Sequence, residues 1–336
     1  MLHTKPKRSK NLKKYSKATL LSGASLLLTG CLDLGDDSDA TIYGTDGDDI
    51  MTGTNNDNKF LGSLGADMID GRGGRDTATY EDSPSAVQID LLGNVGKGGY
   101  AEGDTLVNIE ELRGSNYNDT LVGNEKVNFI KGGSGADIIN AKGGDDFITG
   151  GAGADIINGG DGIDHISYYD SKSAVEINLI TGLGKGGDAE GDTFINIENI
   201  QGSSYDDILI GDGNDNQIYS RGGNDSISIK GNDIVSGGEG IDKIIFDDGY
   251  VVSDIDILKN DNKIIITVKN SDNSMDTVTL DSTETYEIVN GNNIQSVDIK
   301  TIWGDLSAAD QADFNNNEVD FLSWLGNDNG YNYEGL

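Results

Sequence analysis

The chain has 336 residues, with 49 Gly, 2 Pro and a formal net charge of −34. Residues 1–30 contain seven Lys and Arg and no acidic residue, so residues 31–336 contain 17 basic and 58 acidic side chains. This balance excludes nucleic acid as a natural partner and favours cations, and the one cysteine, Cys31, excludes an intrachain disulfide or a cysteine-based zinc site.

Residues 1–30 have the layout of a secretory signal peptide. A basic segment covers residues 5–17, and an apolar segment of 11 residues covers 18–28. The apolar segment is too short for a membrane-spanning helix, which needs about 20 residues. The sequence therefore predicts an exported protein.

The end of this segment, LTGC at residues 28–31, resembles a bacterial lipobox. The resemblance implies cleavage before Cys31 and attachment of lipid to that residue, which anchors the chain stably when two or more acyl chains are present. Leu32, and not an aspartate, follows the cysteine, which favours the outer membrane or cell surface. Residues 31–43 are then a short acidic tether.

A nine-residue repeat fills three blocks, residues 44–79, 114–167 and 202–245. The stretch GGAGADIINGGDGIDHIS, residues 150–167, shows two successive units, and one unit of the last block is shortened. Over 15 units, position 6 is Asp in 12 and Asn in three, while position 8 is always apolar. A fixed aliphatic and a fixed carboxylate at this period indicate a solenoid of stacked repeats.

Two linkers, residues 80–113 and 168–201, separate the blocks and resemble each other. Residues 80–115 and 168–203 are identical at 22 of 36 positions, at an offset of 88 residues. Each linker contains a Val-x-Ile-x-Leu alternation, starting at Val87 and Val175, that is typical of a half-buried strand. The duplicated unit is therefore a linker plus a block.

The repeat predicts an all-β fold, a parallel β-roll or β-helix solenoid. Its first six positions are turn residues, and its last three form a short strand with one inward side chain at position 8. Two units make a coil of 18 residues, and successive coils stack as parallel strands. We expect neighbours at positions 7 and 9, such as Ile138, Ile156 and Phe147, to add to the thin core.

This core is too thin to order the chain alone, and clustered carboxylates repel one another. The turns offer only hard oxygen donors, which are Asp carboxylates and the carbonyl groups of a Gly-rich main chain. Such donors at adaptable geometry suit Ca²⁺ better than Mg²⁺, and the sequence has no His or Cys cluster for a softer metal. Several bound Ca²⁺ ions are therefore expected to stabilise the turns.

The pattern resembles the RTX (repeats-in-toxin, haemolysin-type) calcium-binding nonapeptide repeat, over residues 44–245. The resemblance implies a parallel β-roll with Ca²⁺ held between turns by the position-6 Asp and by turn carbonyls. The second unit of each block departs from the pattern, because Asn58, Asn128 and Asn216 offer only a weaker amide oxygen. The implied metal ligands are Asp49, Asp67, Asp76, Asp119, Asp137, Asp146, Asp155, Asp164, Asp207, Asp225, Asp233 and Asp242.

Residues 246–300 lose the repeat and predict a β-rich C-terminal cap, with strands at 250–258, 263–269 and 276–280. Residues 301–336 predict a short helical and polar tail. Within it, residues 313–320 resemble a shortened EF-hand-like or dockerin calcium loop without its turn glycine. A polar turn is the alternative interpretation of this segment.

No enzyme is predicted, because the chain contains neither an HExxH zinc motif nor a GxSxG nucleophile motif. His165 stands at position 7 of a repeat and is interpreted as a strand-face residue. The favoured hypothesis is a surface-anchored structural or adhesive module that folds on extracellular Ca²⁺ and contacts surface polysaccharide or other surface proteins. The alternative is an accessory or substrate-binding module for a polysaccharide- or protein-degrading enzyme encoded elsewhere.

Overall fold

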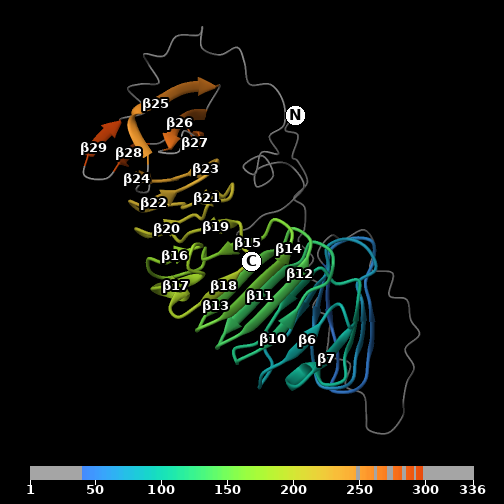
Figure 1. The fold of residues 1–336 in the computed structure, drawn as a ribbon. Coiled ribbons are helices and arrows are strands. Elements are labelled where there is room, and N and C mark those ends of the chain that lie inside the picture. Colours follow the sequence, from blue (N-terminus) through green and yellow to red (C-terminus); the bar gives the residue numbers. More distant parts are fainter. Residues whose placement is uncertain are drawn as a thin grey trace, which may run out of the picture. The chain divides into compact units, whose positions relative to one another are not determined.

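The computed structural model describes residues 40–246 and, beyond them, residues 250–260, 263–270, 275–281, 285–290 and 293–297. These residues form 29 strands and two short 3₁₀ turns without any α-helix, so the all-β prediction is confirmed for the described part (Figure 1). Nor do they include a helix with the length and apolar character to cross a membrane. The predicted signal peptide, the lipid site Cys31 and the tail at 301–336, with its calcium-like loop at 313–320, lie outside the described residues.

The strands form two sheets of 13 strands and one of three strands. In order across the first sheet are β1 (Ala40–Tyr43), β3 (Asn58–Leu61), β5 (Thr77–Thr79), β9 (Glu111–Arg113), β11 (Phe129–Ser134), β13 (Phe147–Ala152), β15 (His165–Ser167), β19 (Asn199–Gln201), β21 (Gln217–Tyr219), β23 (Asp233–Ser236), β27 (Met275–Asp281), β26 (Lys263–Asn270) and β25 (Tyr250–Asn260).

The second sheet extends from the first linker through the second and third blocks to the C-terminal strands. Its order is β7 (Val95–Lys97), β6 (Gln88–Asp90), β10 (Thr120–Val122), β12 (Ile138–Gly143), β14 (Ile156–Asp161), β18 (Thr193–Ile195), β17 (Leu183–Lys185), β16 (Glu176–Asn178), β20 (Ile208–Ile210), β22 (Ser226–Ile229), β24 (Ile241–Phe246), β28 (Thr285–Asn290) and β29 (Asn293–Val297). The third sheet contains β2 (Ile50–Thr52), β4 (Met68–Asp70) and β8 (Thr105–Val107).

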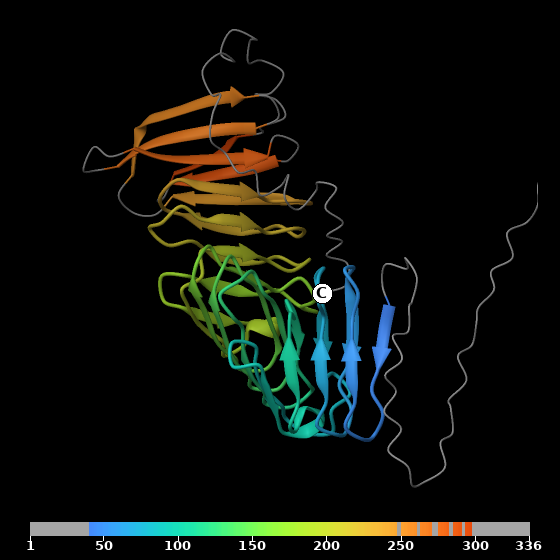
Figure 2. The same cartoon turned by 90° about the vertical axis from the view of Figure 1, so that its right-hand side faces the viewer.

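Strands of the repeat blocks pair in parallel at the predicted coil length. Phe129 of β11 pairs with Phe147 of β13, and Ile138 of β12 pairs with Ile156 of β14, each 18 residues further along the chain. In the second and third blocks, successive units thus alternate between the two large sheets, whereas in the first block they alternate between the first sheet and the three-stranded sheet; Figure 2 shows the strands stacked along the repeat region. The coil of two nine-residue units is confirmed.

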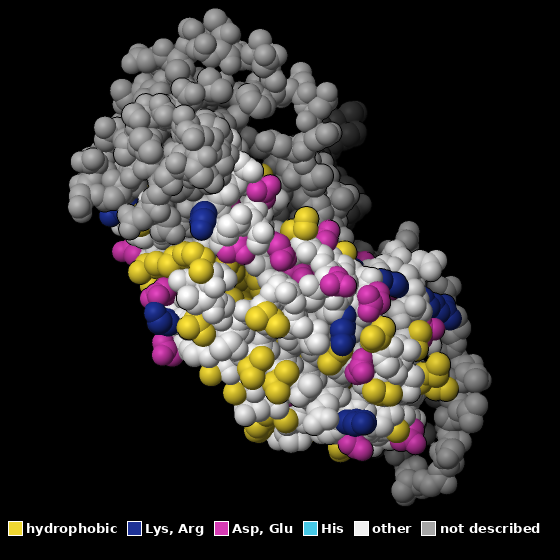
Figure 3. All heavy atoms as spheres, in the orientation of Figure 1, with side chains coloured by type: hydrophobic (Ala, Val, Ile, Leu, Met, Phe, Trp, Pro, Cys, Tyr) yellow, Lys and Arg dark blue, Asp and Glu magenta, His cyan; other side chains and the backbone are white. Residues whose placement is uncertain are grey.

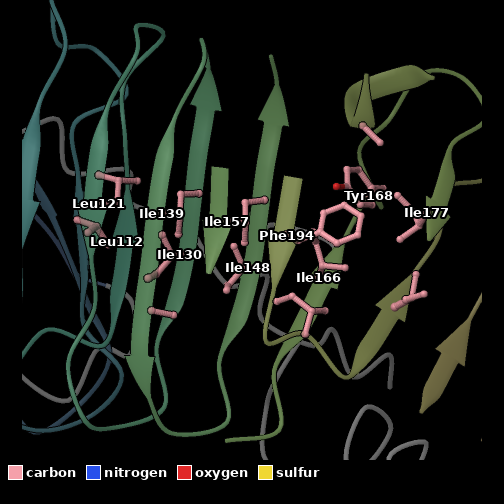
Figure 4. Packing of buried hydrophobic residues seen from close by; sticks show 14 of the residues in the cluster. Leu112, Leu121, Ile130, Ile139, Ile148, Ile157, Ile166, Tyr168, Ile177 and Phe194 are labelled. Atoms are coloured by element: carbon pink, nitrogen blue, oxygen red, sulfur yellow. The ribbon is translucent and has the colours of Figure 1, made fainter. Parts of the chain in front are cut away.

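The core lies between the two large sheets and is built from position 8. Ile130 and Ile148 of the first sheet face Ile139 and Ile157 of the second across a narrow interior (Figure 4). These side chains are almost fully buried, as predicted, because successive side chains of a strand point to opposite faces of the sheet.

The same alternation shows that the prediction for positions 7 and 9 is wrong in the second sheet. Ile138 is 48% exposed and Ile156 is 55% exposed, so neither adds to the core. Both follow the turn directly and point outward. Hydrophobic side chains are visible on the surface of the repeat region in Figure 3. Only Phe147 of the three expected residues is half-buried.

Each linker continues the coil and adds a hairpin strand. In the second linker, β17 pairs antiparallel with both β16 and β18, and in the first, β7 pairs antiparallel with β6. The 3₁₀ turns η1 (Gly99–Ala101) and η2 (Gly187–Ala189) follow the hairpin strands. The predicted strands at Val87 and Val175 are present, and both valines are buried.

Two further findings concern the ends of the repeat region. Residues 40–43, expected to belong to the tether, form β1 and pair in parallel with β3, because Ile42 packs against the core. At the other end, β25, β26 and β27 occupy the three predicted C-terminal strands, and they pair antiparallel with one another. The first sheet therefore continues through these strands beyond the last parallel pair, β23 with β27.

We expect Ile157→Ala to destabilise the roll by about 3 kcal/mol, because it leaves a cavity in a core one side chain thick. Its neighbour Ile156 gives a matched control, since Ile156→Ala removes an exposed side chain from the same strand and should change stability by less than about 0.5 kcal/mol. Urea denaturation in saturating Ca²⁺ measures both values. Equal destabilisation by the two substitutions would contradict the assignment of position 8 as the core.

Candidate metal centre

The position-6 side chains form ladders along the turns. The main-chain N–H of Asp137 donates to Oδ1 of Asp155, at 2.8 Å, and the N–H of Asp146 donates to Oδ1 of Asp164, at 2.9 Å. All four side chains are no more than 1% exposed. One oxygen of each carboxylate therefore replaces a sheet hydrogen bond between coils, a structural role that the sequence analysis did not predict.

The second carboxylate oxygen divides the turns into two kinds. In one kind, here called open turns, Oδ2 of the position-6 Asp is buried and has no hydrogen-bond partner among the described residues. A buried carboxylate oxygen without a donor is costly, and native proteins satisfy such groups with a ligand or an ion. The open turns are those of Asp76, Asp137, Asp146, Asp155, Asp164, Asp225 and Asp242.

In the other kind, here called closed turns, a nearby donor of the chain binds the position-6 side chain. Oδ2 of Asp119 accepts the main-chain N–H of Ser115, whose hydroxyl also donates to Oδ1. Asp207 has the same two bonds from Ser203, at 2.6 and 2.7 Å. The closed turns are those of Asp49, Asn58, Asp67, Asp119, Asn128, Asp207, Asn216 and Asp233.

Burial makes the charged form of the open-turn carboxylates unfavourable. Desolvation, together with the nearby charges of Asp164 and Asp145, raises the pKa of Asp146 to about 8. Desolvation likewise raises the pKa of Asp137 and of Asp155 to about 7, and the charge of Asp137 adds to the shift at Asp155. These sites therefore require a positive charge, which a bound cation supplies, to hold ionised carboxylates at neutral pH.

A main-chain oxygen also lies close to the carboxylate in the open turn of Asp137. A Cβ atom added to Gly132 would lie 2.4 Å from Oδ2 of Asp137 and 2.4 Å from the carbonyl oxygen of Gly150. Only glycine leaves this space, where carboxylate and carbonyl oxygens of successive coils approach each other. No three His, Cys, Asp or Glu side chains form a metal-binding cluster within the described residues. A cation here would be held by carboxylates and main-chain carbonyls, a donor set that fits Ca²⁺.

The linkers contain four acidic residues that the sequence analysis missed. Oδ1 of Asp104 accepts the N–H of Asp67, and Oδ1 of Asp192 accepts the N–H of Asp155, both at 2.8 Å. Their second oxygens accept the hydroxyls of the buried Tyr80 and Tyr168. In the same way, the carboxylates of Glu110 and Glu198 accept the main-chain N–H groups of Asp76 and Asp164.

A sequence signal for these residues exists. Asp104-Thr105-Leu106 and Asp192-Thr193-Phe194 repeat the position-6 to position-8 pattern inside the linkers. The glycines that precede this pattern in a block unit are displaced here by the hairpin, so a fixed nine-residue frame does not find it. The ladders of the first two blocks therefore end on linker carboxylates, because the main-chain N–H groups of Asp104 and Asp192 donate within their own linkers, to Ala101 and Ala189.

The structure brings the twelve predicted ligands into these ladders but not into equivalent surroundings. Seven of them lie in open turns, and five lie in closed turns, namely Asp49, Asp67, Asp119, Asp207 and Asp233. The carboxylates of the five already have donors from their own turn. Their role as ligands stays a prediction, whereas the open turns have the unsatisfied oxygens that a cation needs.

His165 has the surroundings of a strand-face residue. Its ring stacks on Phe147, with ring centres 4.4 Å apart, and Nε2 lies 3.1 Å from Nδ2 of Asn199. Burial lowers the pKa of His165 to about 3, so the imidazole is neutral at physiological pH.

Comparison with known proteins identifies the repeat. A family model of the RTX calcium-binding nonapeptide repeat, in four copies, matches residues 41–78, 113–148, 132–166, 194–227 and 230–249. No curated protein matches the chain. The repeats of this family bind Ca²⁺, and several repeats imply several ions. With the parallel coils, the buried carboxylates and this match in agreement, the chain contains RTX calcium-binding nonapeptide repeats across residues 41–249.

Proposed function

We propose that the protein is an exported, lipid-anchored surface module whose β-roll folds on extracellular Ca²⁺ and serves a structural or adhesive role without catalysis. The observation that carries this proposal is the set of seven buried carboxylate oxygens without donors in the stacked turns. A chain with these groups is disfavoured as a folded protein until a cation binds, so the free energy of binding becomes free energy of folding.

The difference in calcium concentration between the cytosol and the outside of a cell makes this coupling of binding to folding useful. Bound Ca²⁺ supplies the positive charge that neutralises the turn carboxylates. The low calcium concentration of a cytosol keeps the chain unfolded for export, and sites of about 10⁻⁴ to 10⁻³ M affinity fill at extracellular concentrations. Cys31, with the lipobox-like residues before it, is the proposed anchor.

The outer face of the second sheet supports an adhesive role. Ile138 and Ile156 are cross-strand partners, and Ile195 pairs with Asn158, two residues after Ile156. All three side chains are exposed, on a sheet whose strands are fixed by parallel pairing. Exposed hydrophobic side chains that lie together on a rigid surface are typical of protein interaction sites.

A cell-surface protease assay on the full chain and on Cys31→Ser tests the proposal. We expect the wild-type chain to sediment with the outer membrane, and an added protease to degrade it in EGTA but not in millimolar CaCl₂. We expect Cys31→Ser to leave the membrane fraction while keeping its calcium-dependent resistance to the protease, because the substitution removes only the lipid site.

Three results would contradict parts of this proposal. Retention of the wild-type chain in the cytosol would exclude export, and membrane retention of Cys31→Ser would exclude this anchor. Protease sensitivity that is unchanged by Ca²⁺ would exclude calcium-dependent folding at the surface. Turnover or capture of a polysaccharide by the calcium-loaded chain would instead favour the accessory role beside a degrading enzyme.

A further inference from the structure

The residue at position 2 of each unit separates the open turns from the closed turns. In all seven open turns this residue has a positive φ, and it is Gly, Lys or Arg: Arg72 (71°), Gly133 (116°), Lys142 (86°), Gly151 (102°), Gly160 (118°), Arg221 (78°) and Gly238 (83°). In the eight closed turns none has a positive φ, and seven of the eight are Ser, Thr, Asn or Asp: Thr45, Thr54, Ser63, Ser115, Asn124, Ser203, Asp212 and Lys230.

The direction of the position-2 amide explains this correspondence. In the closed turns of Ser115 and Ser203, the main-chain N–H points at the position-6 carboxylate and donates to it. In the closed turn of Ser63 the hydroxyl donates instead, at 3.2 Å. A positive φ turns the peptide group away, so the carboxylate of an open turn lacks this donor.

Two observations connect the open form with a ligand. Lys142, Arg72 and Arg221 hold a positive φ, which non-glycine residues adopt rarely and at a cost that functional sites often retain. Moreover, Asn replaces Asp at position 6 only in closed turns, at Asn58 and two equivalent positions. An Asn side chain at position 6 therefore occurs only where a donor of the same turn binds it, whereas every open turn has an Asp carboxylate at this position.

We infer that Ca²⁺ binds only at the seven open turns, and that the eight closed turns are completed by their own donors in its place. This inference rests on the proposed calcium-dependent folding and assigns the residues that carry it. The first two turns of every block are closed, and open turns stack as neighbours in three pairs, Asp137 with Asp155, Asp146 with Asp164, and Asp225 with Asp242. Calcium sites are thus concentrated in the later units of each block.

Asp119 and Asp137 form a matched pair for a test. They are neighbours on one ladder, each is 1% exposed, and Oδ1 of each accepts a main-chain N–H at 2.7 Å. They differ in the second oxygen, which is bound by Ser115 in one and has no partner in the other. Asn at either position keeps the size of the side chain and one carbonyl oxygen for the ladder.

The experiment counts the ions bound to the full chain by isothermal titration calorimetry with CaCl₂ and by native mass spectrometry. We expect the wild-type chain to bind no more than seven ions, the number of open turns. Asp137→Asn should bind at least one ion fewer, while Asp119→Asn should bind the wild-type number. Circular dichroism of the same samples reports whether each chain has folded.

The outcomes separate this inference from the proposed function. Loss of an ion in Asp119→Asn, or more than seven ions on the wild-type chain, would overturn the inference while leaving calcium-dependent folding intact. A wild-type chain that neither binds Ca²⁺ nor changes its circular dichroism would overturn the proposed function itself. If Asp137→Asn does not fold, the ion counts of Asp119→Asn and of a second closed-turn variant, Asp207→Asn, still decide the matter.

Discussion

Removal of calcium by EGTA is expected to abolish most of the β-sheet circular dichroism of the chain, and readdition of CaCl₂ is expected to restore it. Each nine-residue unit buries one inward side chain, such as Ile148 or Ile157, against an ordering cost of about 1–2 kcal/mol for each residue of the backbone. Without a cation, the same folding would also bury the carboxylates of the open turns. Far-ultraviolet circular dichroism during a calcium titration measures the change.

Two controls make this expectation specific. MgCl₂ at the same concentration should restore little structure, because Mg²⁺ demands octahedral geometry and gives up its water reluctantly. NaCl at matched ionic strength should restore little as well, because screening of the net charge of −34 does not supply ligand bonds to the turns. A full β signal in EGTA would show that the closed turns and the core suffice, and would contradict the coupling of binding to folding.

Gly160→Ala is expected to destabilise the calcium-saturated chain by more than about 3 kcal/mol. Gly160 has a φ of 118°, a conformation that alanine rarely adopts. The new Cβ would also lie 1.9 Å from the carbonyl oxygen of Lys142, the equivalent residue one coil earlier. Relief of this contact would require successive turns to separate, so both the ladder and the open turn would be disturbed.

Gly47→Ala is the control for this substitution. Gly47 is also a turn glycine of a repeat unit, but it lacks a positive φ, and no atom of the described part of the chain lies within 4 Å of a Cβ placed on it. We expect Gly47→Ala to change the free energy of unfolding by less than about 0.5 kcal/mol. Thermal unfolding in saturating CaCl₂ compares the two variants, and equal melting temperatures would show that the coils are not packed as closely as the described backbone has them.

The coil length and the core could be predicted from the sequence because both depend on covalent geometry. A strand residue at position 8 points opposite to its neighbours at positions 7 and 9, which explains why Ile157 is buried while Ile156 is exposed. Ile156 was expected in the core because it is hydrophobic. Its side chain points to solvent because side chains alternate between the two faces of a strand.

The division between open and closed turns could not be predicted from the position-6 residue alone. Asp119 and Asp137 are the same residue at the same position of neighbouring coils, yet only one of them has a free oxygen. The difference arises four residues earlier, at Ser115 and Gly133, where the backbone conformation decides whether an amide reaches the carboxylate. A consensus that weights every position-6 Asp equally therefore predicts more ligands than the open turns provide.

The hydrogen bonds of the two linkers give the molecule a period longer than the coil. Tyr80 binds Asp104 as Tyr168 binds Asp192, at an offset of 88 residues. In both copies the linker valine, Val87 or Val175, donates its main-chain N–H to the position-6 Asp of the next coil, Asp119 or Asp207. The segment of residues 80–167 thus begins and ends at the same kind of interface, so a copy of it can be gained or lost without creating a new junction. Recombination between copies in the gene can therefore change the length of the roll in steps of one segment.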